Sequence, residues 1–89
     1  MATYLVAYDL NSRGRDYSLF FKAIESYGTF AHCLSGAWVI KSDGPADAIR
    51  QELSQHIADG DLLFVVRLAR EAGWTGFSDA AGDWLKEHL

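Results

Sequence analysis

Residues 3–10 read TYLVAYDL, a run of β-branched and aromatic residues that ends at the turn-forming pair Asn11-Ser12. This composition predicts a β-strand. Successive side chains of a strand point to opposite faces of the sheet. One face carries Tyr4, Val6, Tyr8 and Leu10, and the other carries Leu5, Ala7 and Asp9. Because both faces are largely apolar, we expect a central strand that is covered on both sides.

Two amphipathic helices are predicted from apolar residues that recur at steps of three and four. The first helix follows the N-cap candidate Asp16 and ends at Gly28, the place of a C′ glycine. The second has Pro45 in its first turn and ends at Gly60. Their apolar stripes are Tyr17, Phe20, Ile24 and Tyr27 in the first helix, and Ala46, Ile49, Leu53 and Ile57 in the second.

Three further strands complete the predicted sheet. Residues 29–35 and 37–42 flank Gly36 and predict a β-hairpin. Residues 61–68 contain the unbroken apolar run LLFVV, which is typical of a strand buried on both faces. The order strand–helix–strand–strand–helix–strand is that of a ferredoxin-like fold, an α+β fold with an antiparallel sheet.

The C-terminal part adds one more helix. A loop with two glycines and Trp74 follows the last strand, and Ser78 is the N-cap candidate of a helix. The apolar side of this helix consists of Ala81, Trp84 and Leu85. We therefore expect residues 1–89 to form a single ferredoxin-like domain with an extra C-terminal helix.

The net charge and the single cysteine limit the classes of function that are possible. The net charge of −4 disfavours nucleic-acid binding, which depends on clustered Lys and Arg. The single Cys33 cannot form an internal disulfide, so we expect a reduced, cytoplasmic protein. The N-terminus lacks the basic region of a signal peptide, and no apolar run reaches the ~18 residues of a membrane span. No association with a membrane is therefore expected.

The aromatic content points to a second copy of the chain. The sequence has three Trp, four Tyr and five Phe, and each aromatic side chain can bury roughly 150–250 Å². This supply exceeds what a small core needs. Two helices on one side of the sheet also leave the other apolar side to be covered by the last helix and a partner. We expect a homodimer with twofold symmetry.

Four segments carry a family resemblance: the strand end AYDL at 7–10, the helix end IESYG at 24–28, the hairpin segment LSGAWVI at 34–40 and the strand LFVVRL at 63–68. Together they resemble the CRISPR-associated protein 2 superfamily, and more closely its stand-alone SinR-like relatives near the virulence-associated protein D toxins. The resemblance covers most of the chain through about Leu68. It implies a homodimer of ferredoxin-like domains. Some members of this superfamily are metal-dependent nucleases, and others are structural dimers that hold DNA.

The chain departs from this family in two respects. Members that work with nucleic acid tend to be more basic, whereas this chain is acidic. The segment around Trp74 and the helix at 78–89 replace the usual C-terminal strand and tail. We expect Trp74, in its glycine-bearing loop, to be an interface residue.

Asp9 is the one candidate for chemistry. The resemblance implies that this Asp, at the end of the first strand, binds a divalent metal near the dimer axis. Mg²⁺ or Mn²⁺ held by two Asp9 carboxylates would serve the hydrolysis of RNA or DNA. The alternative is an ion pair with Arg13, Arg15 or Arg67, or a loop cap, because an unpaired carboxylate beside apolar residues is costly.

The neighbours of Asp9 have two interpretations each. Arg13 and Arg15 flank a glycine in a loop and either bind phosphates of a nucleic acid or form part of a solvated loop. Tyr8 belongs to the core or orients a ligand. Two functions therefore stay open: a dimeric, metal-dependent nuclease and a non-catalytic dimeric scaffold or regulatory protein-interaction module.

The histidines and the cysteine favour no other chemistry. His32, His56 and His88 lack the spacing of metal ligands. His32 and Cys33 are adjacent on a strand, so their side chains should point to opposite faces. This geometry excludes a Cys–His nucleophile pair, and Cys33 is expected to be a small buried hydrophobe.

Overall fold

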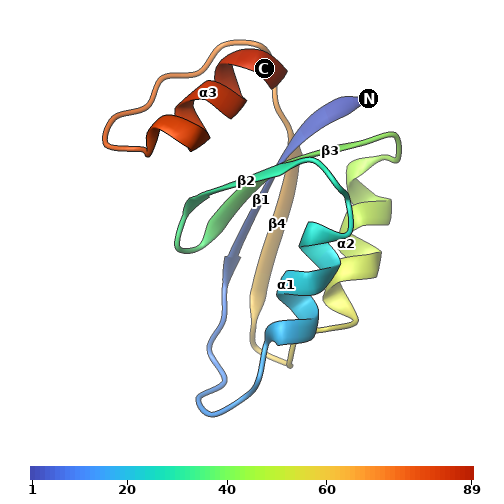
Figure 1. Ribbon diagram of the computed structural model, residues 1–89. Helices are drawn as coiled ribbons and strands as arrows, with labels where there is room; N and C mark the ends of the chain where they lie inside the picture. The colour runs from blue at the N-terminus through green and yellow to red at the C-terminus, as the bar shows by residue number, and fades with distance from the viewer.

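The computed structural model describes residues 1–89 and contains four strands and three helices (Figure 1). In chain order these are β1 (Ala2–Asp9), α1 (Ser18–Glu25), β2 (Phe30–Leu34), β3 (Ala37–Ser42), α2 (Ala46–Ser54), β4 (Leu62–Arg67) and α3 (Asp79–His88). The predicted succession of elements is confirmed, including the extra C-terminal helix. None of the helices is long and apolar enough to cross a lipid bilayer.

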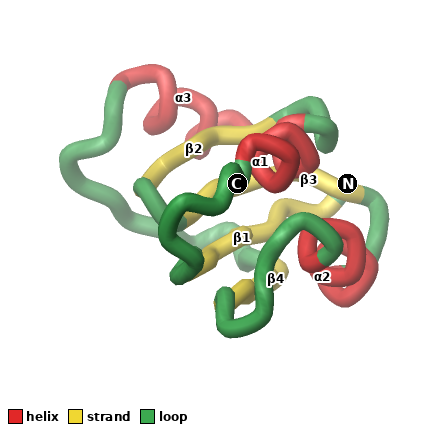
Figure 2. The backbone as a smooth tube through the Cα atoms, turned by 90° about the horizontal axis from the view of Figure 1, so that it is seen from below, coloured by secondary structure: helices red, strands yellow, loops and turns green.

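The four strands form one antiparallel sheet in the order β2-β3-β1-β4. β1 lies between β3 and β4, with Val6 opposite both Trp38 and Val65. The prediction of a central first strand is therefore confirmed, but the prediction that it is covered on both sides is wrong, because Leu5 and Ala7 are only half-buried and Asp9 is exposed. Figure 2 looks along the sheet and shows α1 and α2 together on one side of the sheet, with α3 beyond β2.

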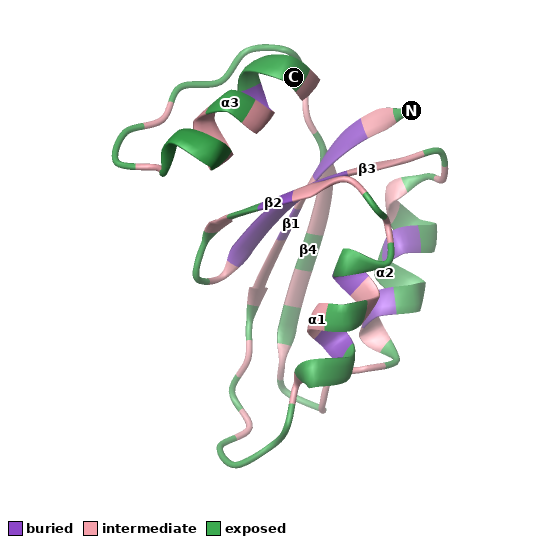
Figure 3. Cartoon of the chain, viewed as in Figure 1, coloured by how far each residue is buried: buried purple, intermediate pink, exposed green.

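The core lies between this sheet and the helix pair α1 and α2 (Figure 3). The predicted helical stripes supply it, because Phe20 and Ile24 of α1 are fully buried, as are Ile49 and Leu53 of α2. Across from them lie the inward-facing side chains of the strands, which are Tyr4, Val6, Trp38 and Ile40. The 3.6-residue periodicity thus forms the packed face of each helix. Both helices are shorter than predicted, Ser18–Glu25 and Ala46–Ser54, so Tyr17, Tyr27 and Ile57 of the predicted stripes lie outside them.

Two glycines act as predicted. Gly28 follows α1 with a φ of 87°, a left-handed conformation that glycine adopts without steric cost. Gly36 lies at the hairpin turn, where its carbonyl accepts a hydrogen bond from the Tyr8 N–H at 2.9 Å. A Cβ at this position would lie only 3.0 Å from the Tyr8 carbonyl oxygen. Gly36 therefore allows the turn to approach the end of β1.

The position of β4 corrects the sequence prediction of a strand buried on both faces. β4 is an edge strand, and its side chains Leu62 and Phe64 are 60% and 62% exposed. Leu63 and Val65 point to the core, whereas Leu62 and Phe64 point to the side without α1 and α2. The apolar run arises because both faces of β4 carry apolar side chains, although this chain covers only one of them.

α3 covers the opposite side of the sheet over β2 and β3. Its N-cap is the predicted Ser78, whose Oγ accepts a hydrogen bond from the Ala81 N–H at 3.2 Å. Leu85 of α3 is buried, as are Ala31 and Val39 on this side of the strands. Cover therefore ends beyond β3 except at the start of β1, where Thr3 is 9% exposed and its Oγ1 donates a hydrogen bond to the His88 carbonyl of α3.

Candidate functional site

Asp9 is the last residue of β1 and lies on the side of the sheet that α1 and α2 leave open. It pairs in register with Leu62 of β4 and shares its face with Leu5 and Ala7. Its carboxylate is exposed and makes no hydrogen bond or ion pair. A shallow cavity of about 230 Å³ lies beside it, against Phe64. An unpaired carboxylate thus stands at the end of an exposed apolar surface.

The ion pair that was one interpretation of Asp9 is not formed. Arg67 pairs in register with Tyr4, five residues and roughly 17 Å back along β1. The chain's one ion pair between side chains joins Asp47 to Arg50 at 2.8 Å. Only the backbone of Asp9 takes part in loop capping, because its carbonyl accepts a 3.4 Å hydrogen bond from the Asn11 Nδ2.

A second carboxylate, that of Asp61, organises the loop after β1. Its Oδ1 accepts a hydrogen bond from the Asn11 N–H at 2.7 Å. Its Oδ2 accepts hydrogen bonds from the Tyr17 hydroxyl at 2.7 Å and from the Ala58 N–H at 2.8 Å. The Asn11 N–H above all, then Tyr17, Ala58 and the charge of Arg15, hold the pKa of Asp61 below its ordinary value, although partial burial acts in the opposite direction.

These hydrogen bonds fix the loop at 10–17 to the turn that precedes β4. Sequence reasoning missed this role of Asp61. The only local signal is a Gly-Asp pair before an apolar run, and the partners Asn11 and Tyr17 lie 50 and 44 residues away. Only the tertiary fold shows that the loop and the turn meet.

Arg13 and Arg15 lie in the loop that Asp61 fixes. Both are exposed, and Gly14 between them has a φ of 78°. The guanidinium carbon of Arg15 lies 5.7 Å from the centre of the Tyr17 ring, a cation–π distance. Contacts through Tyr17, Asp61 and Asn11 therefore connect this basic loop to the end of β1 that carries Asp9.

Tyr8 has a structural role. Its hydroxyl donates a hydrogen bond to the Ser35 carbonyl at 3.1 Å and accepts one from the Trp38 Nε1–H at 2.9 Å. Burial raises the pKa of Tyr8, against the opposing effect of the Trp38 hydrogen bond. Ser35 and Gly36 lie beside the end of β1, and their hydrogen bonds hold Tyr8 in place.

The geometry also excludes a Cys–His pair. The His32 ring stacks on Trp38, with ring centres 4.1 Å apart. The Cys33 thiol approaches the Ala31 carbonyl at 3.7 Å, and burial raises its pKa, which disfavours the reactive thiolate. No group of three or more His, Cys, Asp or Glu side chains in the chain is arranged to hold a metal.

The Trp74 side chain, from the loop before α3, packs against α3 of its own chain. The indole Nε1 would be 3.3 Å from a Cβ at Gly82, so the glycine makes room for the ring. The side chain is half-buried and keeps some exposed surface. Gly82 weakens the intrinsic helix propensity of α3, but in exchange it lets the preceding loop pack closely.

The chain was compared with models of protein families, with curated proteins and with solved structures, and none of the three comparisons found a match.

Proposed function

We propose that the chain forms a homodimer of ferredoxin-like domains that cleaves RNA or DNA with Mg²⁺ or Mn²⁺ at paired Asp9 residues. The observation that carries the proposal is the free Asp9 carboxylate at the end of an exposed apolar sheet surface. The strand order β2-β3-β1-β4, with two helices on one side, supports the ferredoxin-like assignment. The resemblance to CRISPR-associated protein 2 supports both the fold and the role of Asp9.

The open part of the sheet supports the homodimer. Leu62 and Phe64 are more than half exposed, and Leu5, Ala7 and Val66 of the same face are only partly covered. Exposed apolar patches of this kind usually mark an interaction site. Because α3 covers the β2 and β3 half and only the start of β1, the rest of the β1 and β4 half is free to pair with its twofold equivalent. An axis near the end of β1 would bring two Asp9 carboxylates together.

Paired Asp9 residues suit a divalent cation. Mg²⁺ binds proteins through one or two carboxylates and keeps several waters, which fits one carboxylate from each protomer. When bound, the ion supplies Lewis acidity toward a phosphodiester. Arg13 and Arg15 would bind neighbouring phosphates, and Asp61 holds their loop beside the site. The free thiol of Cys33 favours a reduced, cytoplasmic setting for this reaction.

The first prediction concerns this site. Purified protein should cleave end-labelled RNA or DNA with Mg²⁺ or Mn²⁺ and not with EDTA. The Asp9→Asn variant should lower the cleavage rate by about 10²-fold or more, because it removes the charge that holds the ion. The Asp83→Asn variant, with an exposed carboxylate on α3, is the matched control and should cleave normally.

A readout independent of cleavage completes the test. Mn²⁺ should broaden the amide NMR signals of Asp9 and its neighbours in the unaltered protein and not in Asp9→Asn. Cleavage that persists in Asp9→Asn would contradict the proposed mechanism.

The second candidate function is a non-catalytic dimeric scaffold or regulatory module. The net charge of −4 and the absence of a metal-ligand cluster within one chain favour it. Titration with nucleic acid at ~50 mM salt separates the two, because phosphate contacts are strong under these conditions. No binding would favour the scaffold, whereas a monomer at every concentration would contradict both functions.

A further inference from the structure

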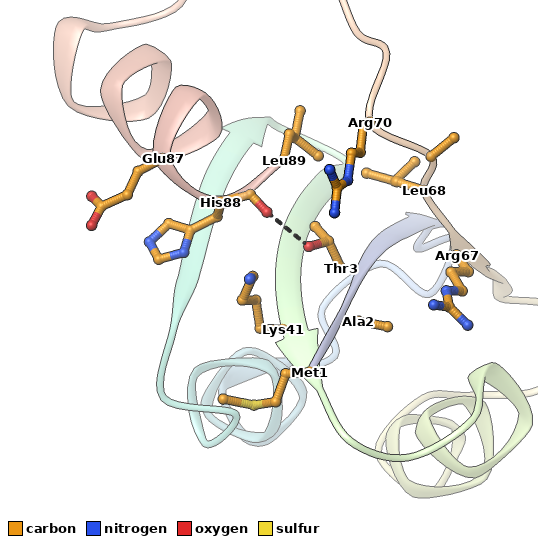
Figure 4. Close-up of a pocket in the computed structure, with 11 residues that line it drawn as sticks. Met1, Ala2, Thr3, Lys41, Arg67, Leu68, Arg70, Glu87, His88 and Leu89 are labelled. Carbon is orange, nitrogen blue, oxygen red and sulfur yellow. Dashed lines mark hydrogen bonds between the residues drawn. The ribbon is translucent and has the colours of Figure 1, made fainter.

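A basic cavity lies at the opposite end of β1 from Asp9. It has a volume of about 320 Å³ and is formed where the start of β1, the end of β4 and the end of α3 meet (Figure 4). Three of its lining residues are basic, Lys41, Arg67 and Arg70, and Glu87 carries a side-chain carboxylate. Lys41 pairs in register with Thr3 on the α3 side of the sheet, whereas Arg67 pairs with Tyr4, whose side chain faces α1 and α2. Thr3, near the start of β1, is about six residues and roughly 20 Å from Asp9. The cavity is therefore separate from the candidate nuclease site.

The wall of the cavity is held in place by Thr3, which is only 9% exposed. Its Oγ1 donates a hydrogen bond to the His88 carbonyl at 3.1 Å, which attaches the end of α3 to β1. Its carbonyl accepts a hydrogen bond from the Leu68 N–H at 2.9 Å, and it pairs in register with Lys41. In Figure 4, Lys41 and Arg70 lie on either side of Thr3, and Arg67 lies beyond β1.

The three cations have no partner within the chain. None of Lys41, Arg67 and Arg70 takes part in an ion pair. They make up three of the chain's eight Lys and Arg residues, so the remaining five share the rest of the molecule with eleven of its twelve carboxylates. Positive charge is thus concentrated near the start of β1 in an acidic protein. The repulsion among these cations would be relieved by a bound anion.

We propose that this cavity binds a phosphate monoester. Lys41 and Arg70, which lie on either side of Thr3, and Glu87 give this face a formal side-chain charge of 2 − 1 = +1, with Arg67 nearby on the other face of the sheet. A phosphate monoester carries a charge near −2 at neutral pH and offers three acceptor oxygens, so it can accept hydrogen bonds from both Lys41 and Arg70. Arginine guanidinium groups present paired N–H donors that match phosphate oxygens. The volume also exceeds that of a bare phosphate and lies within the range of small-molecule sites.

Two sources share this chemistry, a free small molecule such as a nucleotide and the phosphorylated end of a nucleic-acid strand. Neither depends on the proposed nuclease activity, because the cavity does not include Asp9. The test therefore uses binding and not cleavage. Failure of this inference would leave the role of Asp9 unaffected, and the reverse also holds.

The test is an NMR titration of the isotope-labelled chain with inorganic phosphate and with a nucleoside 5′-monophosphate, at constant ionic strength. We expect the amide signals of Thr3, Leu68 and Arg70 to shift. The double variant Lys41→Met/Arg70→Gln should weaken binding about tenfold or more, because it removes charge-assisted hydrogen bonds. The variant Lys22→Met removes a charge from exposed α1 and should bind normally.

A variant with the opposite expected effect on binding keeps the test decisive if the double variant fails to fold. Glu87→Gln removes the one side-chain carboxylate of the lining and should strengthen binding severalfold. Absence of shifts at ~10 mM ligand would overturn the inference. So would an equal weakening by Lys22→Met and by the double variant, since that would reflect net charge alone.

Oligonucleotides distinguish the two sources. Tighter binding of a 5′-phosphorylated strand than of both the mononucleotide and the same strand without its phosphate would identify a strand end as the ligand. Equal binding of the mononucleotide and the phosphorylated strand would identify a small phosphate monoester. Either result supports a phosphate monoester site.

Discussion

Two aspartates at the same end of the sheet have opposite surroundings. Asp61 accepts three hydrogen bonds from Asn11, Tyr17 and Ala58, and all three are 2.8 Å or shorter. Asp9 accepts none at its carboxylate. A carboxylate whose lone pairs are occupied by the protein is fixed and serves the structure, whereas a free one can bind a cation. This contrast assigns loop fixation to Asp61 and leaves Asp9 available for function.

The second prediction concerns the Asp61→Asn variant. The folded-state pKa of Asp61 lies below its ordinary value of 3.8, so the charged form stabilises the fold above that value. This contribution is lost as the pH falls through the folded-state pKa. The melting temperature of Asp61→Asn should therefore be lower than that of the unaltered protein above about pH 5, and the gap should narrow below about pH 4. Thermal unfolding followed by circular dichroism across pH measures this gap.

The matched control is Asp59→Asn. Asp59 is exposed and takes no part in the hydrogen bonds of Asp61. Its removal should leave the melting temperature unchanged at every pH. An Asp61→Asn gap that stays constant down to about pH 2 would contradict the assigned charge effect.

The hairpin of β2 and β3 depends on its contact with β1. The Gly36 carbonyl accepts the Tyr8 N–H, the Tyr8 hydroxyl reaches the Ser35 carbonyl, and the Trp38 indole donates to the Tyr8 hydroxyl. The turn of one element thus closes over the end of another. Such a close approach of two backbones leaves no space for a side chain at Gly36.

The third prediction is that Gly36→Ala lowers the free energy of unfolding by about 1–3 kcal/mol. The added Cβ would lie 3.0 Å from the Tyr8 carbonyl, a backbone atom that cannot move without disturbing β1. Urea unfolding measures the change. Gly73→Ala is the control, because nothing lies within 4 Å of its added Cβ and its φ is not in the left-handed region. Equal stability of the two variants would show that the turn adjusts freely.

The molecule as a whole has a sheet that is unevenly covered. α1 and α2 cover most of one side, and α3 covers the β2 and β3 half of the other together with Thr3 at the start of β1. The side chains that remain open belong to β1 and β4. Charge is distributed unevenly as well, because three cations gather at one end of β1 while Asp9 lies at the other end.

The fourth prediction is that Phe64→Glu converts the proposed dimer into a monomer. Phe64 is 62% exposed at the centre of the open face, and a charge there would have to be desolvated on pairing. We expect the dimer dissociation constant to rise by about 30-fold or more. Analytical ultracentrifugation measures it. Leu19→Glu is the control, because Leu19 is 64% exposed on α1, away from this face.

Two outcomes decide this prediction. A monomeric Phe64→Glu variant with an unchanged circular dichroism spectrum would support pairing through the open face. Dimerisation that persists in Phe64→Glu and is lost in Leu19→Glu would place the contact on α1 instead.

Local patterns were sufficient to predict the elements of this fold. The alternation at 3–10, the stripes through Phe20 and Ile49, the glycine at 28 and the cap at Ser78 all act over one or two turns of chain. These signals depend on periodicity and backbone conformation, which neighbouring residues largely set. The end of β1 was likewise recognisable, because Asp9 follows a strand pattern and precedes a turn signal.

Other features required the assembled fold. The apolar run of β4 does not reveal that its strand lies at an edge, because that depends on the order of strands in the sheet. Asp61 meets Asn11 and Tyr17, and Lys41 and Arg70 come to line one cavity, only after distant segments pair in register. Composition predicts how much apolar and charged surface a chain has. Where that surface is exposed, and which charges converge, follows from long-range pairing.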